Sequence, residues 1–304
     1  MSDGNGILLR GLDGSNPLAF LAALGTLRTL TLALPDEIVK MGWDQCDGAW
    51  RPCVWCSLAS DGDAVLEKLD KALVRSRSSH PTRFIDYKLS NKEAVDFYQS
   101  VRAGEPIEPE RDAWIASLTN DIHPDATSPL QLTRSDYFVG NLDQVLANTT
   151  ADHLRRALFL PWRYDDPLSG QSLHVDPTED RRHAYQWNQP SGDPNRNKSG
   201  NMLGANRLAI ESLPLFLGLP STNAARLLMT GWTGVRSDDA TWTWPIWEVP
   251  ISLEVVKSAI SLADLQAINQ KPDWLIPVGI RAVYRTRRIL VEKTPNLTPA
   301  ICVI

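Results

Sequence analysis

Carboxylate and imidazole side chains gather in one polar stretch of the chain. They are Asp165, Asp166, His174, Asp176, Glu179, Asp180 and His183. Carboxylate oxygens suit Mg²⁺ or Mn²⁺, and a bound metal ion can activate water for phosphodiester hydrolysis. However, the spacing matches no nuclease signature, and an Asp before a Pro, as at 166–167 and 176–177, is also natural at a turn. A metal site, structural turns with ion pairs and a nucleic-acid-binding loop are all open interpretations.

Basic side chains surround and interrupt this stretch. Residues 196–201 (RNKSGN) precede a predicted helix, where backbone N–H groups and nearby cations can bind a phosphate. Their spacing is not that of a Walker motif, so a solvated loop is the alternative. The candidate nucleic-acid contacts of the region are Arg155, Arg156, Arg163, Arg181, Arg182, Arg196, Lys198 and Arg207.

A second group of arginines lies near the C-terminus. Arg281, Arg285 and Arg287 alternate with other residues, so a strand would place them on one face together with Val283. Such a row could follow the backbone of a polyanion. A charged sheet edge that discourages pairing with other chains is the alternative.

Cys53 and Cys56 have CxxC spacing, and Cys46 precedes them. A structural zinc site normally needs four ligands, and a redox CxxC precedes a helix in a βαβ unit; neither context is visible. In a strand the two thiols would face opposite sides. We therefore expect buried, reduced thiols, with no metal site and no cofactor.

Composition excludes a chain that binds nucleic acid through bulk charge. The 304 residues carry 36 acidic and 31 basic side chains, a formal net charge of -5, so any nucleic-acid contact must be local.

No apolar run approaches bilayer length and no basic leader precedes residue 7, which leads us to expect a cytoplasmic protein without membrane contact. Eleven tryptophans suit core filling, with base stacking as the alternative.

Local patterns predict an α+β fold. Asn16-Pro17 is a strong helix start, because Asn accepts from free backbone N–H groups and Pro suits the first helical position. We expect one α+β domain over 1–304, with a mixed sheet formed by N- and C-terminal strands and a possible helical insertion at 60–160. The expected helices are 16–34, 90–104, 109–119, 142–159, 201–217 and 252–267, and helical periodicity is also present at 65–73. The expected strands lie at 7–9, 37–58, 230–236, 241–249 and 276–292.

Two segments resemble accessory proteins of type I-U (I-G) CRISPR loci, a group that includes Cas helicase-nuclease extensions. Residues 12–28 read LDGSNPLAFLAALGTLR, which is similar to the N-terminal segment of proteins in that group. Residues 176–185 (DPTEDRRHAY), 204–209 (GANRLA) and 213–216 (LPLF) resemble its later motifs, in the same order. The resemblance implies a role in RNA-guided interference against foreign DNA, with other effector subunits or the Cas helicase-nuclease as partners. It supplies no catalytic residues.

The leading hypothesis is a non-catalytic subunit that binds crRNA, target DNA or an effector protein. No nucleophile elbow, P-loop, dinucleotide fingerprint or zincin helix is present, so no catalytic residue is assigned. One alternative is a metal-dependent nuclease that uses Asp165, Asp166, His174, Asp176, Asp180 and His183. The other is a protein-docking adaptor that does not contact nucleic acid.

Overall fold

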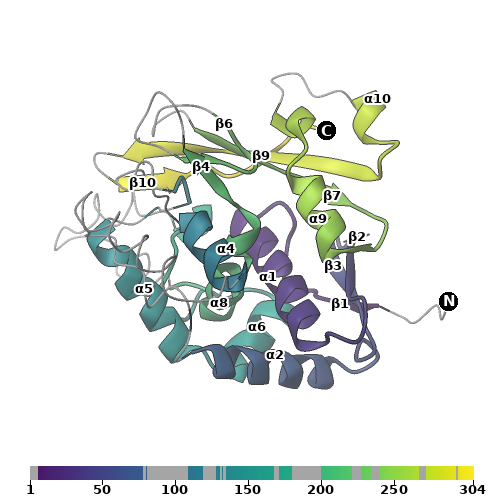
Figure 1. Ribbon diagram of the computed structural model, residues 1–304, viewed down its shortest axis with the longest axis vertical. Coiled ribbons are helices and arrows are strands. Elements are labelled where there is room, and N and C mark those ends of the chain that lie inside the picture. The colour runs from purple at the N-terminus through teal and green to yellow at the C-terminus, as the bar shows by residue number, and fades with distance from the viewer. Residues whose placement is uncertain are drawn as a thin grey trace.

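The chain folds as an α+β protein, as the sequence predicts (Figure 1). The computed structural model describes residues 6–77, 80, 109–118, 128–130, 132, 135–167, 171–179, 200–220, 227–233, 240–266, 272–291 and 294–304. The predicted helix at 90–104 lies outside this part of the chain. Figure 1 shows α2 and α6 at one end of the molecule, the sheet that contains β9 at the other, and α1 with α8 beside it between them.

Local signals locate the described helices well. Asn16 caps α1, since its Oδ1 accepts from the N–H groups of Leu18 and Ala19 at 2.8 and 3.1 Å. The helix predicted over 142–159 is two helices, with a break at Thr149 and Thr150. The helices are α1 (Pro17–Ala33), α2 (Gly62–Ser76), α4 (Pro109–Leu118), α5 (Ser135–Asn148), α6 (Ala151–Phe159), α8 (Leu203–Ser212), α9 (Leu253–Ile260) and α10 (Pro272–Leu275), with short 3₁₀ turns η2 (Pro177–Glu179), η4 (Leu213–Leu215) and η5 (Ala263–Gln266).

The strands pair antiparallel in two separate sheets and a hairpin. One sheet has the order β1 (Ile7–Leu8), β3 (Ala49–Trp55), β2 (Lys40–Cys46) and β8 (Ile251–Ser252). The other has the order β10 (Thr294–Leu297), β9 (Ile280–Val291), β7 (Thr241–Trp247) and β6 (Trp232–Thr233), and β11 (Ile301–Cys302) also pairs with β9. The hairpin joins β4 (Gly218–Pro220) to β5 (Leu227–Met229).

The predicted pairing of the first strands with the last ones is wrong in detail. The N-terminal strands pair with β8, whereas the C-terminal strands form their own sheet around β9. Hydrophobic alternation specifies which face of a strand is buried, but any strand with a compatible face can become its neighbour. No parallel pair is found among the described strands, so the described sheets are antiparallel and not mixed.

Helix α1 is the centre of the core. Every residue from Pro17 to Leu30 is buried, and α1 packs closely on α8. At Gly25 a side chain would place its Cβ 1.7 Å from the carbonyl oxygen of Leu208, so only glycine permits this approach. Buried residues of α2, α5 and α6 belong to the same hydrophobic cluster, so the predicted helical insertion shares its core with the sheets.

Aromatic side chains fill the space between α1 and the sheets. Phe20 stacks on Trp43, and it also contacts Trp242 and Trp244 with ring centroids 6.1 and 5.7 Å apart. Trp43, Trp242, Trp244 and Trp247 are all buried. The core-filling interpretation is therefore confirmed for these tryptophans.

A buried ion cluster joins α1 to α8. Glu211 lies between Arg28, whose Nη1 is 3.2 Å from its Oε2, and Arg207, which forms an ion pair with its Oε1. His80 Nε2 lies 3.3 Å from the same Oε1. Burial alone would raise the pKa of Glu211, but Arg207, His80 and Arg28 together hold it well below its usual range.

Gly25→Ala should destabilise the protein by about 1–3 kcal/mol or more, because the new methyl group meets backbone of α8 that cannot rotate away. Gly140→Ala is the matched control, since Gly140 is exposed within α5 with open space around its Cβ position. Gly140→Ala should stabilise the protein by about 0.5–1 kcal/mol, because alanine has a higher helix propensity than glycine. Urea unfolding midpoints would measure both, and equal effects would contradict the close packing of α1 on α8.

Replacement of Glu211 by Gln should destabilise the protein at neutral pH by about 3 kcal/mol, because the buried Arg207 then loses its carboxylate partner and Arg28 keeps only the exposed Glu110. The folded-state pKa of Glu211 is lowered, so its contribution is present above the ordinary value of 4.5 and is lost as pH falls toward the folded-state pKa. Below pH 4.5 the unfolding free energy of the wild type should therefore fall more steeply than that of the variant. Glu67→Gln, in the exposed pair with Lys71, should change stability by less than about 1 kcal/mol at every pH.

Candidate functional site

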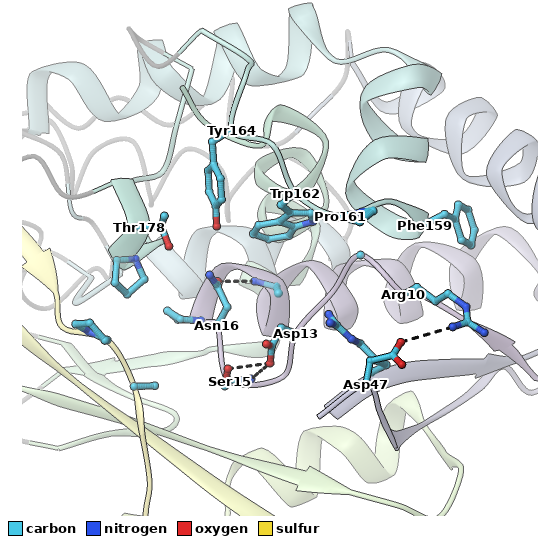
Figure 2. Close-up of a pocket in the computed structure, with 17 residues that line it drawn as sticks. Arg10, Asp13, Ser15, Asn16, Asp47, Phe159, Pro161, Trp162, Tyr164 and Thr178 are labelled. Atoms are coloured by element: carbon cyan, nitrogen blue, oxygen red, sulfur yellow. Dashed lines mark hydrogen bonds and ion pairs between the residues drawn. The ribbon is translucent and has the colours of Figure 1, made fainter. Parts of the chain in front are cut away.

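A cavity of about 650 Å³ opens at the N-terminus of α1 (Figure 2). Its walls come from the turn before α1, from the hairpin of β2 and β3, from the segment after α6 and from the chain beyond β10. The lining residues are Arg10, Gly11, Asp13, Ser15, Asn16, Pro17, Ala19, Asp47, Arg51, Phe159, Pro161, Trp162, Tyr164, Pro177, Thr178, Pro299 and Ala300. A cavity of this size suits a small ligand or one residue of a polymer.

The floor of the cavity is the turn that leads into α1. Asp13 Oδ1 accepts from the backbone N–H and the hydroxyl of Ser15 at 2.9 and 2.8 Å, which closes a local turn. Asn16 then caps the helix. The first helical N–H groups are already bound by Asn16, so the helix end contributes its dipole and shape to the floor but not free donors.

The two segments that carry the family resemblance meet at this cavity. Asn16 Nδ2 donates to Asp176 Oδ1 at 3.0 Å, although 160 residues separate them. Tyr164 donates its hydroxyl to Asp176 Oδ2 at 2.9 Å. Burial raises the pKa of Asp176, and burial with the nearby Asp176 charge raises that of Tyr164. Asp176 is therefore a buried link between the α1 cap and the opposite wall.

Two arginines bring positive charge to the cavity. Arg51 Nη1 donates to the carbonyl oxygen of Leu12 at 3.0 Å, and Arg51 forms no ion pair with a described residue. Its other guanidinium donors remain available to a ligand. Arg10 lies at the mouth, where it faces Asp47 at 3.8 Å; both side chains are largely exposed, so this pair is weak.

Aromatic rings form the wall opposite the α1 turn. Figure 2 shows Trp162 between Tyr164 and Pro161, with Phe159 farther along the same segment. Trp162 and Tyr164 meet edge to face at 5.9 Å. The indole N–H of Trp162 donates to the carbonyl oxygen of Ala157 at 2.9 Å, so what it offers to a ligand is its ring.

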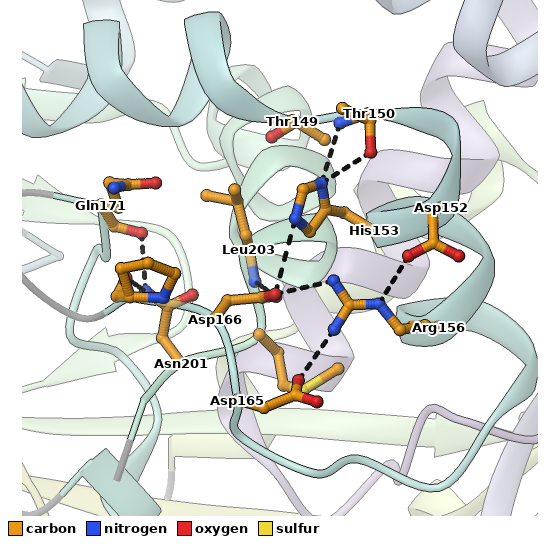
Figure 3. A network of polar contacts seen from close by, with 12 residues as sticks. Thr149, Thr150, Asp152, His153, Arg156, Asp165, Asp166, Gln171, Asn201 and Leu203 are labelled. Carbon is orange, nitrogen blue, oxygen red and sulfur yellow. Dashed lines mark hydrogen bonds and ion pairs between the residues drawn. The ribbon is translucent and has the colours of Figure 1, made fainter. Parts of the chain in front are cut away.

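Asp166 holds this aromatic segment in place (Figure 3). Its Oδ1 accepts from Arg156 Nη2 at 2.7 Å and lies 3.5 Å from His153 Nε2, while Oδ2 accepts from the backbone N–H of Leu203 at 2.8 Å. His153 Nδ1 accepts from the N–H of Thr150, which places the ring proton on Nε2, toward Asp166. One carboxylate therefore ties the segment to α6 and to the start of α8.

The predicted cluster of carboxylates and imidazoles is divided in the structure. Asp165 and Asp166 bind Arg156, and Asp176 binds Asn16 and Tyr164. His174 Nδ1 lies 3.1 Å from Glu179 Oε2. Within the part of the chain that the structure describes, no group of His, Cys, Asp or Glu is arranged to hold a metal ion. Asp180 and His183 lie outside the described residues.

Several arginines predicted to bind nucleic acid have carboxylate partners instead. Arg207 is 1% exposed and forms the ion pair with Glu211, so the prediction of a phosphate contact is wrong for it. Arg156 contacts Asp152, Asp165 and Asp166, which together exceed its charge. Arg155 pairs with Asp63 and Arg281 pairs with Glu248.

The predicted strand of arginines is present, but it does not form a continuous row. β9 contains Arg281, Arg285 and Arg287, but its pairing with β7 shifts register at Arg281, because Ile246 pairs with Ala282 and Trp247 with Ile280. Val283 between them is buried in a small cluster with Leu265 and Leu275, and the half-buried Arg285 donates to Thr243 at 3.2 Å. Arg287 is exposed, as is Arg163 on the cavity segment. Arg181, Arg182, Arg196 and Lys198 lie outside the described residues.

The thiols of the CxxC segment are ordinary core and surface groups. Cys53 is buried on β3, and burial raises its pKa to about 12; burial also raises that of Cys56. A thiol with a raised pKa is a poor nucleophile and a poor metal ligand at neutral pH. The expectation of a buried thiol is confirmed for Cys53.

Sequence reasoning missed most of the cavity. Arg10, Arg51 and Trp162 belong to no motif, and neither residue type nor spacing distinguishes them from other surface residues. The only available signal was position, since Arg10 lies just before the segment at 12–28 and Trp162 just after a predicted helix. Their convergence is a tertiary property.

Comparison with known proteins adds no relative. No protein-family model matches the chain, and no curated protein matches it in sequence. Among the described residues, no helix combines the length and apolar character needed to span a bilayer.

Asp166→Asn should destabilise the protein by about 1–3 kcal/mol, because a buried carboxylate loses its charge-assisted hydrogen bonds from Arg156 and Leu203, although Arg156 keeps Asp152 and Asp165. Asp165→Asn is the matched control: the Asp165 side chain is 54% exposed against 5% for Asp166, and both contact Arg156. Asp165→Asn should lower the free energy of unfolding by no more than about 1 kcal/mol. Thermal unfolding would compare them, and equal losses would contradict the assigned role of Asp166.

Proposed function

We propose that this chain is a non-catalytic nucleic-acid-binding subunit of type I-U (I-G) CRISPR interference, and that it binds through the cavity at the start of α1. The observation that carries the proposal is the presence, around one cavity, of two guanidinium groups and a fixed aromatic wall. Cationic groups follow a phosphate backbone and aromatic rings stack on bases, which is the usual combination in proteins that bind single strands.

The position of the cavity supports the link to the CRISPR group. The resemblance rests on residues 12–28 and on motifs that begin at Asp176, and these segments meet through Asn16 and Asp176. Pro177 and Thr178 of the second segment line the cavity beside Ser15 and Pro17 of the first. A functional site shared by the two segments would account for their occurrence in one chain.

The charge distribution supports local rather than extended binding. The chain is acidic overall, and Arg155, Arg156, Arg207 and Arg281 are matched by carboxylates. Arg51 has no ion pair with a described residue and its counterpart Arg10 has only a weak one. Binding would therefore involve few phosphates, with crRNA or target DNA as the nucleic acid and other effector subunits or the Cas helicase-nuclease as protein partners.

Arg51→Gln should weaken the binding of a labelled single-stranded oligonucleotide about tenfold, since it removes a phosphate contact worth about 1.4 kcal/mol. Trp162→Ala should weaken it by a similar or larger factor through lost stacking. Two phosphate contacts predict a slope of about -1.4 for log affinity against log salt, and Arg51→Gln should reduce its magnitude by about 0.7. Fluorescence anisotropy at several salt concentrations measures all three quantities.

Arg281→Gln is the matched control, because it removes the same charge from β9, where Arg281 already pairs with Glu248. It should leave affinity and salt slope unchanged. Loss of affinity in the Arg281 variant equal to that in the Arg51 variant would point to diffuse electrostatic binding. Complete absence of oligonucleotide binding would favour the protein-docking alternative, and cleavage of the probe with Mn²⁺ would favour the nuclease alternative.

A further inference from the structure

The side chains that line the cavity indicate which class of nucleic acid it binds. This inference rests on the proposed function. We propose that the cavity holds one ribonucleotide of a single-stranded RNA, with the base on Trp162, the phosphate on Arg51 and the ribose 2′-hydroxyl on Asp13. Each of these three contacts is inferred from a separate feature of the cavity.

The aromatic wall requires a base that is not stacked within a duplex. Trp162 is fixed by its hydrogen bond to Ala157 and by its contact with Tyr164, so a ring face is offered in one orientation. A base inside a helix has both faces covered by its neighbours, whereas an unpaired base can stack on an aromatic side chain. The wall therefore selects single strands.

Inside the cavity Arg51 suits the phosphate of this nucleotide, while Arg10 at the mouth would contact a neighbouring phosphate of the strand. Arg51 is anchored through Nη1 to the backbone of Leu12, which orients the guanidinium while its remaining N–H groups stay available. Asp13 and Asp47 also line the cavity, so its formal charge with Arg10 and Arg51 sums to zero. A neutral lining favours a single phosphate over a cluster such as a triphosphate, because further anionic groups would meet the carboxylates.

Asp13 supplies the contact that distinguishes RNA from DNA. Its Oδ1 is used by Ser15, while its Oδ2 accepts no hydrogen bond from a described residue. A carboxylate oxygen can accept from the ribose 2′-hydroxyl, the group that DNA lacks. The same Asp13 that shapes the turn before α1 therefore becomes the residue that determines sugar specificity.

Oligouridylate and oligodeoxyuridylate of equal length test this directly, since they differ only in the 2′-hydroxyl. Measured by anisotropy with the full-length chain, the ribose strand should bind about tenfold more tightly, as expected for one charge-assisted hydrogen bond. In Asp13→Ser the ratio should fall to about one, because serine can still close the turn with Ser15 but has no second oxygen. An unlabelled RNA duplex should not compete with the labelled single strand.

Asp47→Ser is the matched control, since it removes a carboxylate from the rim of the same cavity and should keep the ribose preference. Thermal unfolding would verify that both variants are folded. Equal binding of the two strands by the wild type, a preference unaffected by Asp13→Ser, or competition by the duplex would overturn the ribonucleotide assignment alone. Absence of binding to either strand, or binding unaffected by Trp162→Ala and Arg51→Gln, would overturn the proposed function as well.

Discussion

The close contact between α1 and α8 is the constraint on which the rest of the structure depends. Gly25 lets the backbones approach until a methyl group would not fit, and the Arg28, Glu211 and Arg207 cluster ties the same two helices by buried charge. Buried ion pairs contribute little net stability against an apolar alternative, but they penalise any arrangement that separates them. The position of α1 is therefore strongly specified, and so is the position of the turn before α1, which forms the floor of the cavity.

The cavity follows from the way the chain satisfies polar groups around that helix. Asn16 caps α1 and binds Asp176, and Asp176 binds Tyr164 on the opposite wall. Asp166 anchors the same wall to α6 and α8. Both carboxylates are buried, so a movement of the wall would leave unpaired polar groups in the interior, which is costly. A preformed site of this kind binds without first ordering its own residues.

The charge pattern of the molecule separates structural arginines from available ones. Arg156 and Arg207 each contact carboxylates within the fold, while Arg51 leaves donors toward a cavity lined with aromatic rings. An acidic chain that carries nucleic acid in this way would depend on a few directed contacts, and long-range attraction would add little at physiological salt.

The sequence by itself determined the α+β class, the capped start of α1 at Asn16, the strand at Ile280–Val291 and the burial of the tryptophans around β7. These are local properties, because caps reach two or three residues and side-chain alternation is set by the backbone. Only the tertiary structure decided strand pairing, which arginines are neutralised, and that Asp13, Arg51 and Trp162 line one cavity. Those outcomes depend on packing between elements far apart in the chain. Residue type and sequence spacing do not show which of these elements come into contact.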